Sequence, residues 1–268
     1  MYTDCHVHTV FSSDSSTLIP RQIDRAIELG MKRIYITDHQ DFDFPEKKYG
    51  MSFVFDTQSY FEKLKEIQKA AKGQIEVLIG VELGLRPHLV DKLKTYTASY
   101  PFDYVIGSVH IVRDIDPYYP EFYKGRTEKE AYLEYFETML ENVKLHHDFD
   151  ALGHLDYVVR YGPNTNKYYS YSAYSDVIDE ILKVIIEKQI ALEVNTAGIK
   201  YGLGHTNPHP DVIKRYLELG GEMVVLGSDA HEPKHLGYAF PEMKDFLASC
   251  GVKYLTNFKK RKPEIIKI

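Results

Sequence analysis

The chain has 268 residues, of which 44% are hydrophobic and 27% are charged, a composition typical of soluble globular proteins. Its net charge of −6 argues against a broad nucleic-acid-binding surface, and no apolar run is long enough to span a bilayer. Because the chain has two cysteines and residues 1–20 lack a basic, apolar leader, we expect a cytoplasmic protein without a disulfide framework. No linker or low-complexity tract interrupts the sequence, so we predict one domain over residues 1–268.

Hydrophobic periodicity predicts strands and helices that alternate along the chain. The first predicted strand ends near residue 8, and the later ones cover about 33–37, 75–81, 104–109, 150–154, 190–195, 223–227 and 252–258. The predicted helices cover about 19–29, 57–72, 88–99, 127–147, 173–188, 211–219 and 241–249. We expect the basic stretch 259–262 to be a solvated terminus. The alternation predicts a parallel sheet with covering helices, either a barrel or a doubly wound sheet.

Polar residues gather where the predicted strands end. On the first strand, period-two alternation predicts that Asp4, His6 and His8 project together, while Cys5 faces outward and packs against a helix. Similar residues at or just past the ends of later strands are His39, Glu82, His110, His154, Asp229 and His231. In an open sheet these residues would be spread along an edge. In a closed barrel they meet at one mouth, where barrel enzymes carry their chemistry, so their distribution favours the barrel.

These side chains have the chemistry of a metal centre. All of the candidate ligands offer imidazole nitrogen or carboxylate oxygen, and none offers sulfur, which suits Zn, Mn or Fe(II). The candidates are His6, His8, Asp14, His39, Glu82, His110, His154, Asp229 and His231. Nine donors exceed the needs of one ion, so we expect two or three divalent ions, with a carboxylate such as Glu82 bridging a pair. Paired ions can hold a bridging hydroxide and stabilise the attacking and leaving oxygens at phosphorus.

Six short motifs resemble those of the PHP (polymerase and histidinol phosphatase) superfamily. They are Asp4-x-His6-x-His8, Thr37-Asp38-His39, Gly80-Val-Glu82, Gly107-Ser-Val-His110, Gly153-His154-Leu-Asp156 and Gly227-Ser-Asp229-Ala-His231. The resemblance runs from residue 2 to about residue 240 and is closest to the stand-alone histidinol-phosphate phosphatases. It implies a distorted (β/α)7 TIM-like barrel of parallel strands and outer helices that holds a trinuclear metal site.

The resemblance also implies which residues hold each ion. It assigns the first ion to His6, His8, Glu82 and Asp229, the second to Glu82, His110 and His154, and the third to Asp14, His39 and His231. Many family members have His at the position of Asp14. A carboxylate there still coordinates, but it can change the metal preference or the affinity of the third site.

Phosphate recognition needs cations beside the metals. Arg160 lies six residues past His154 in a predicted loop over the barrel mouth, and its guanidinium fork matches two phosphate oxygens. The family resemblance adds Lys200, which follows the stretch Asn195-Thr-Ala-Gly. For both cations an ordinary surface role is the alternative, and for Arg160 that role is a surface salt bridge.

The resemblance predicts hydrolysis of L-histidinol phosphate to L-histidinol and inorganic phosphate, a step of histidine biosynthesis, through in-line attack of a metal-bridging hydroxide. Glu82, Asp229, His231 and Arg160 are then the catalytic candidates. The acid that protonates the leaving alkoxide stays open between metal-bound water, Asp229, His231 and His205, and His205 is also a candidate for substrate binding. Acidic pocket residues and some of the 22 tyrosines would receive the amine and the imidazole.

Two other functions stay open at this point. One is a PHP phosphoesterase that acts on nucleotides, phosphopeptides or nucleic-acid ends. The other is a non-catalytic metal-binding scaffold, although every ligand position holds a competent residue. The expected partner is a small phosphorylated molecule rather than nucleic acid or a membrane, and the oligomeric state is not predicted.

Overall fold

The computed structural model describes residues 3–268 and contains one main parallel sheet. Its strands are β1 (Arg33–Ile36), β2 (His39–Gln40), β3 (Glu76–Gly84), β4 (Tyr104–Ser108), β5 (Ala151–Leu152), β6 (Ala191–Asn195) and β7 (Val224–Gly227). They are ordered β1-β3-β4-β5-β6-β7, and β2 continues beyond β1 along the same side of β3. Nearly every strand residue is buried, as expected where helices cover one face of a sheet and the other face closes on itself.

Residues 4–8 lie between β1 and β7 and join the two ends of this sheet. The N–H of Cys5 donates to the carbonyl of Leu226 at 3.0 Å, and the N–H of Tyr35 donates to the carbonyl of Asp4 at 3.0 Å. The predicted parallel TIM-like barrel is therefore confirmed. The segment itself forms only isolated bridges to Ile34 and Ala230, so the prediction of a regular first strand is wrong. Too few bonds form on either side to build a ladder.

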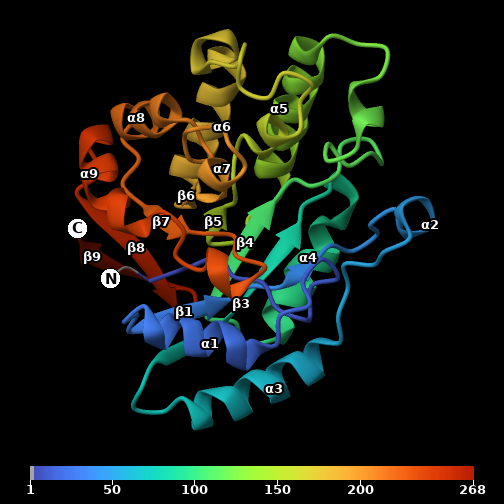
Figure 1. The fold of residues 1–268 in the computed structure, drawn as a ribbon. Coiled ribbons are helices and arrows are strands. Elements are labelled where there is room, and N and C mark those ends of the chain that lie inside the picture. Colours follow the sequence, from blue (N-terminus) through green and yellow to red (C-terminus); the bar gives the residue numbers. More distant parts are fainter. Residues whose placement is uncertain (1–2) are drawn as a thin grey trace.

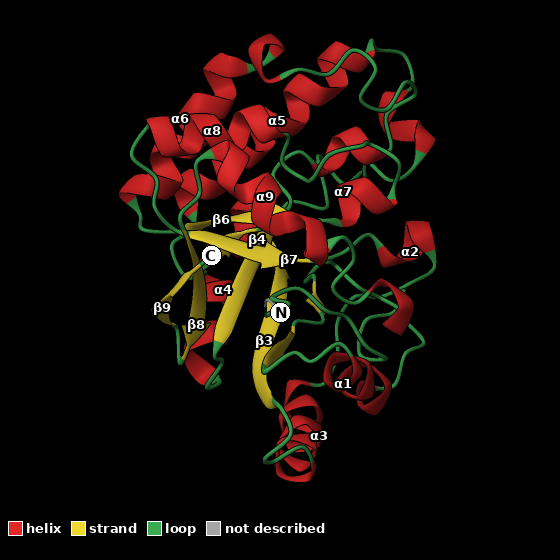
Figure 2. Ribbon diagram, turned by 60° about the vertical axis from the view of Figure 1, so that its left-hand side comes forward, coloured by secondary structure: helices red, strands yellow, loops and turns green. Residues whose placement is uncertain are grey.

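The helices surround the strands, as Figures 1 and 2 show. They are α1 (Ile19–Glu28), α2 (Glu46–Tyr49), α3 (Thr57–Ala70), α4 (Val90–Ser99), α5 (Glu128–Leu145), α6 (Ser175–Glu187), α7 (Ala197–Lys200), α8 (Pro210–Glu218) and α9 (Phe240–Cys250). The seven long helices confirm the predictions to within a few residues, whereas the single-turn helices α2 and α7 were not predicted. No helix among residues 3–268 combines the length and apolarity needed to cross a membrane.

The C-terminal part of the chain is an antiparallel hairpin of β8 (Tyr254–Lys259) and β9 (Lys262–Lys267). The prediction of a solvated terminus at residues 259–262 is confirmed only for Lys260 and Lys262, which are exposed, because the stretch also turns the hairpin and anchors it. Lys259 pairs with Glu76 at 2.6 Å, and Arg261 pairs with Asp150 at 2.6 Å. Each pair joins the hairpin to residues at the N-terminal ends of barrel strands. The hairpin therefore covers the end of the barrel opposite to the predicted site.

A small apolar cluster fills the barrel interior below the predicted site. It consists of Cys5, Tyr35, Leu78, Tyr104, Ile106, Ala151, Ala191, Val225 and Phe258. Leu78 precedes Glu82 by four residues on β3, so the two side chains share the inner face. Cys5 is therefore inside the barrel, and its predicted outward direction is wrong, because the irregular N-terminal segment does not alternate like a strand. The cluster forms an apolar base beneath the polar site.

Candidate metal centre

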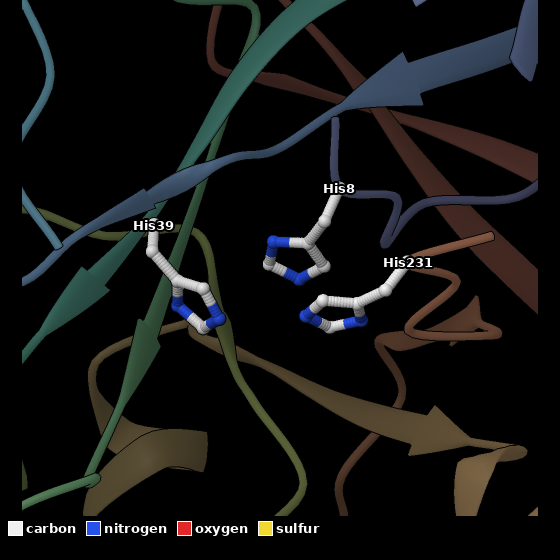
Figure 3. Close-up of side chains that lie close together, drawn as sticks. All are labelled: His8, His39 and His231. Carbon is white, nitrogen blue, oxygen red and sulfur yellow. The ribbon is translucent and has the colours of Figure 1, made fainter. Parts of the chain in front are cut away.

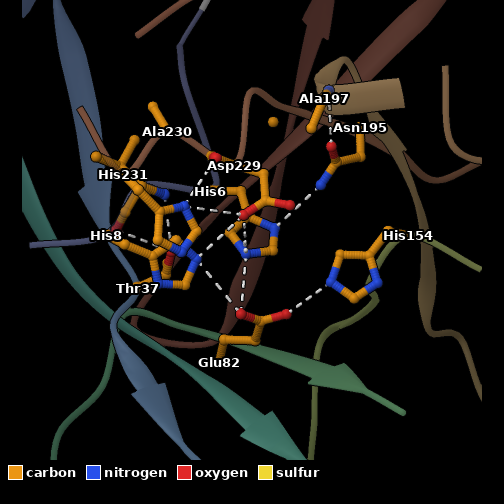
Figure 4. A network of polar contacts seen from close by, with 12 residues as sticks. His6, His8, Thr37, Glu82, His154, Asn195, Ala197, Asp229, Ala230 and His231 are labelled. Atoms are coloured by element: carbon orange, nitrogen blue, oxygen red, sulfur yellow. Dashed lines mark hydrogen bonds and ion pairs between the residues drawn. The ribbon is translucent and has the colours of Figure 1, made fainter. Parts of the chain in front are cut away.

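Glu82 is the centre of the site. It lies within β3, which pairs with β1 and β2 on one side and with β4 on the other, and is fully buried. Its Oε2 atom lies 3.1 Å from His6 Nε2 and 3.0 Å from His39 Nδ1, while Oε1 lies 3.2 Å from His110 Nε2 and 3.0 Å from His154 Nε2. Figure 4 shows the carboxylate between the rings of His6 and His154. Four imidazoles from different segments around the barrel thus meet at one carboxylate, and one of them is His39, which the resemblance assigned to the third ion rather than to an ion held by Glu82.

Asp229 is the second carboxylate of the cluster and lies two residues past the end of β7. Its Oδ1 atom lies 3.4 Å from His8 Nε2 and 3.8 Å from His6 Nε2. Its φ of 54° lies in the left-handed region, which few residues other than glycine adopt. Backbone strain of this kind collects at functional sites, where the surrounding structure holds it in place.

Asp14 and His231 complete the cluster on its outer side. Asp14 Oδ2 lies 3.0 Å from His231 Nε2 and 3.6 Å from His39 Nε2. The His8 ring lies between His39 and His231, with ring centres 4.3 and 4.1 Å away (Figure 3). All nine predicted ligands therefore lie in one continuous group of side chains.

Several buried atoms of this group make no hydrogen bond, although some of the nitrogens lie 3.0–3.4 Å from a carboxylate oxygen. They are His6 Nε2, His8 Nε2, His39 Nδ1, Glu82 Oε2, His154 Nδ1 and His231 Nε2. Buried polar atoms of this kind are rare unless an ion or a water satisfies them. Four overlapping sets of three side chains place their donor atoms within 4.8 Å of one another: His8–His39–His231, His6–Glu82–His154, His6–His8–Asp229 and His39–Asp41–His110. Donor type, burial and spacing fit divalent metal ions.

A model of the PHP domain family matches residues 4–197 of this chain. The chain belongs to the PHP family. A probable histidinol-phosphatase of Clostridium acetobutylicum is 38% identical over 256 residues, which cover 94% of this chain and 95% of the relative. The histidinol-phosphatase of Lactococcus lactis is 33% identical over 257 residues, which cover 95% and 93%.

Two solved structures show the same fold as this chain. The crystal structure of the Lactococcus lactis histidinol phosphate phosphatase, complexed with zinc, L-histidinol and phosphate, matches with a TM-score of 0.89 at 33% identity over 98% of both chains. The putative histidinol phosphatase of Listeria monocytogenes matches with a TM-score of 0.78 at 21% identity, over 90% of this chain and 99% of that one. The second likeness concerns the fold alone.

The charges in this PHP centre stabilise one another. Burial favours the neutral form of His6, but the carboxylates of Glu193 and Glu82 raise the pKa of that imidazole well above its ordinary value. Burial likewise disfavours the carboxylate form of Glu82, yet the imidazoles around it, His6 first, keep its pKa well below the ordinary value. For His8, burial and the neighbouring ring of His231 both lower the pKa. Without metal, the centre thus combines an anionic Glu82 with a cationic His6 and a neutral His8, and a bound ion would displace the proton of His6, because metals coordinate neutral imidazole.

A shell of polar residues behind the imidazoles was not predicted. His6 Nδ1 lies 2.6 Å from Glu193 Oε1, and His110 Nδ1 lies 2.6 Å from Asp41 Oδ2. Such partners fix the ring orientation of metal-binding histidines. Gly84 makes room for the second pair, because a Cβ there would lie 2.6 Å from Asp41 Cγ. Two features of the sequence could have indicated these partners. Glu193 is an acidic residue in the middle of the apolar run 190–195, and Asp41 lies only two residues past the predicted ligand His39.

Asp4 does not join the metal cluster, so the prediction that it projects with His6 and His8 is wrong. Its carboxylate accepts hydrogen bonds from the N–H and hydroxyl of Ser228 and from the N–H of Gly237. Burial raises the pKa of Asp4 to about 6, although these hydrogen bonds oppose the rise. Asp4 therefore holds the chain just before Asp229 rather than contacting an ion.

A cavity of about 650 Å³ opens beside the PHP centre. His39, His110, His154, Asp229 and His231 form part of its wall, and aromatic side chains form much of the rest. The aromatic residues are Phe44, Phe53, Tyr118, Tyr119, Tyr157, Tyr161 and Tyr201. A concave site in which aromatic side chains surround convergent polar groups is typical of small-molecule binding.

Arg160 and Lys200 both line this cavity. Arg160 is buried, and its terminal nitrogens donate to Asp229 Oδ2 at 2.9 Å and Asn195 Oδ1 at 3.1 Å. The alternative of a surface salt bridge is therefore wrong for Arg160. Lys200 Nζ donates to the carbonyl of Asp229 at 3.3 Å, and burial lowers the pKa of this ammonium.

His205 is not among the residues that line the cavity. Its Nδ1 lies 2.7 Å from the carbonyl of Thr206, and its ring centre lies 4.7 Å from that of His209. The structure thus brings together every predicted site residue except His205.

Proposed function

We propose that this protein is a metal-dependent phosphomonoesterase that hydrolyses L-histidinol phosphate to L-histidinol and inorganic phosphate in histidine biosynthesis. The observation that carries the proposal is the buried group of nine nitrogen and oxygen donors beside the aromatic cavity. It occurs on a chain that matches histidinol phosphatases over almost its whole length. The proposal treats residues 1–268 as one catalytic domain. It places the protein in a reducing cytoplasm, which suits its two free, buried cysteines.

The proposed centre holds up to three ions of Zn, Mn or Fe. The ligands of the first are His6, His8, Glu82 and Asp229, those of the second are Glu82, His110 and His154, and those of the third are Asp14, His39 and His231. The distances between these side chains support the grouping. When bound, the ions would supply Lewis acidity for the phosphoryl group and for the attacking water.

Arg160 is proposed to bind the phosphate. Asn207, Asp229 and Asn195 accept three of the five guanidinium N–H groups, so one N–H on each terminal nitrogen is left for phosphate oxygens. Because these partners fix the guanidinium plane, little side-chain entropy is lost on binding. Lys200 adds a second positive charge on the cavity wall.

We infer the side chain that could protonate the leaving alkoxide by elimination among the predicted candidates. Burial opposes ionisation of Asp229, but His6, His8 and Arg160 keep its pKa well below the ordinary value. We therefore assign Asp229 the role of a ligand and hydrogen-bond acceptor rather than that of a proton donor, and His205 is not among the residues that line the cavity. Of the three side chains predicted for this role, His231 is the one left on the cavity wall.

Release of inorganic phosphate from L-histidinol phosphate tests the proposal. We expect turnover after incubation with Mn²⁺ or Zn²⁺, and its loss in chelator-treated protein. A panel of nucleotides, phosphopeptides and nucleic-acid ends should give much slower turnover, because the cavity suits a small leaving group. Faster turnover of a panel member would favour another phosphoesterase. Absence of turnover with fewer than two ions per chain would favour a scaffold.

A further inference from the structure

One buried carboxylate on the cavity wall forms no ion pair with any side chain of residues 3–268. Asp116 lies in the long loop between β4 and α5, is 8% exposed, and lines the cavity. It belongs to none of the sets of side chains that could hold a metal. Its Oδ1 atom accepts the N–H of Tyr118 at 2.8 Å, but among residues 3–268 its carboxylate takes part in no ion pair. By contrast, Asp14, Glu82 and Asp229 each contact imidazole or guanidinium groups.

A buried carboxylate without a counter-ion is costly. Burial raises the pKa of Asp116 to about 6, while the Tyr118 N–H and the charge of His110 oppose that rise. Near neutral pH the group is still mainly ionised. The cavity wall therefore carries a negative charge that a bound cation would neutralise.

Asp116 is held in place from the neighbouring loop. Its N–H donates to the hydroxyl oxygen of Tyr49 at 3.2 Å, and that hydroxyl donates to Glu121 at 2.7 Å. The Tyr49 ring stacks on Tyr119 with ring centres 4.1 Å apart, and Lys48 pairs with Glu121 at 2.7 Å. These contacts tie α2 to the loop that carries Asp116. A preorganised carboxylate loses little entropy when a ligand binds.

Tyrosine rings connect Asp116 to the proposed phosphate site. The ring centre of Tyr161 lies 5.1 Å from that of Tyr118 and 5.0 Å from that of Tyr157. The ring centre of Tyr157 in turn lies 5.5 Å from the guanidinium carbon of Arg160. The faces of such rings attract cations. The cavity thus has a cationic residue at one end of an aromatic wall and an unpaired carboxylate at the other.

We infer that Asp116 is a specificity-determining residue that binds the primary ammonium group of an aminoalkyl phosphomonoester. The inference rests on the proposed function. It adds the residue by which the protein would distinguish an amine-bearing phosphomonoester from one without an amine. In L-histidinol phosphate the primary amine carries a full positive charge at neutral pH, whereas an imidazole is then mostly neutral. The ammonium is therefore the partner that a buried carboxylate selects.

The experiment compares Asp116→Asn with wild type on L-histidinol phosphate and on its deaminated analogue, 3-(imidazol-4-yl)propyl phosphate. Asn keeps the acceptor for the Tyr118 N–H but removes the charge. We expect the preference for the amine-bearing substrate, as a ratio of kcat/KM values, to fall roughly 10- to 100-fold, the loss of one charged hydrogen bond. The matched control is Asp114→Asn in the same loop, an exposed carboxylate paired with Arg86, which should keep the wild-type preference.

Two outcomes would overturn the inference. In the first, wild type shows no preference for the amine-bearing substrate. In the second, Asp116→Asn slows both substrates by the same factor at unchanged metal content, as a structural role predicts. Failure of wild type to hydrolyse either phosphomonoester is a different result, which would reject the proposed function itself.

Discussion

His6 Nδ1 lies 2.6 Å from Glu193 Oε1, and both side chains are completely buried. The other carboxylate oxygen of Glu193 accepts the N–H of His154 at 2.7 Å. One residue thus sets the direction of the His6 ring and the backbone position of a second proposed ligand. The geometry of the metal centre therefore depends on β6, although no metal ligand is proposed on that strand.

We predict that Glu193→Gln lowers metal affinity by roughly 10- to 100-fold, the usual effect of losing an outer partner of a metal ligand. Gln has the same shape but cannot match the charge assistance of the carboxylate. Titration of chelator-treated protein with Zn²⁺ in a competing indicator measures the effect. Glu187→Gln, on the exposed end of α6, is the control. Wild-type affinity in Glu193→Gln would show that Glu193 has no influence on the centre.

The close packing of β7 against the N-terminal segment gives a second prediction. A Cβ on Gly227 would lie 2.5 Å from His6 Cβ and 2.7 Å from Glu193 Oε1. Gly227→Ala must therefore displace His6 or its partner Glu193, which should lower the free energy of unfolding by about 1–3 kcal/mol. We expect lower metal occupancy together with a lower melting temperature, and a larger loss for Gly227→Ser. Full metal occupancy in both variants would mean that the N-terminal segment carrying His6 can shift without disturbing the centre.

The buried pair of Arg160 and Asp229 gives a third prediction. Arg160→Met leaves Asp229 buried without its guanidinium partner, and breaking such a pair costs about 3–5 kcal/mol. Denaturant unfolding of the metal-free protein measures this loss. Arg25→Met is the control, because Arg25 and Glu28 form an exposed pair on α1 that should contribute less than about 1 kcal/mol. Equal losses in the two variants would show that Arg160 does not stabilise Asp229.

Most of the proposed metal ligands could be brought together from the sequence because they lie at or just past the ends of buried strands, and parallel strands bring their C-terminal ends together. Glu193 could not be placed in the same way. An acid in the middle of a strand faces either the interior or solvent, and only the closed barrel decides which. Asp116 lies in a loop without periodicity, where its position depends on contacts with Tyr49 and Tyr118. The hairpin strand β9 was missed because its sequence is short, charged and mostly exposed.

The raised pKa of Asp116 predicts how its effect on stability depends on pH. Its folded pKa of about 6 exceeds the ordinary value of 3.8, so between these values the folded state binds more protons than the unfolded state. The carboxylate therefore costs nothing below about pH 4. It destabilises the fold progressively as pH rises to about 6, by on the order of 2–3 kcal/mol.

Asp116→Asn removes this penalty. Its melting temperature relative to wild type, measured without substrate, should increase from pH 4 to pH 6 and then level off. The same comparison with Asp114→Asn should show no such rise, because that carboxylate is exposed. A constant difference across this range would mean that Asp116 titrates in the folded protein as it does in the unfolded chain.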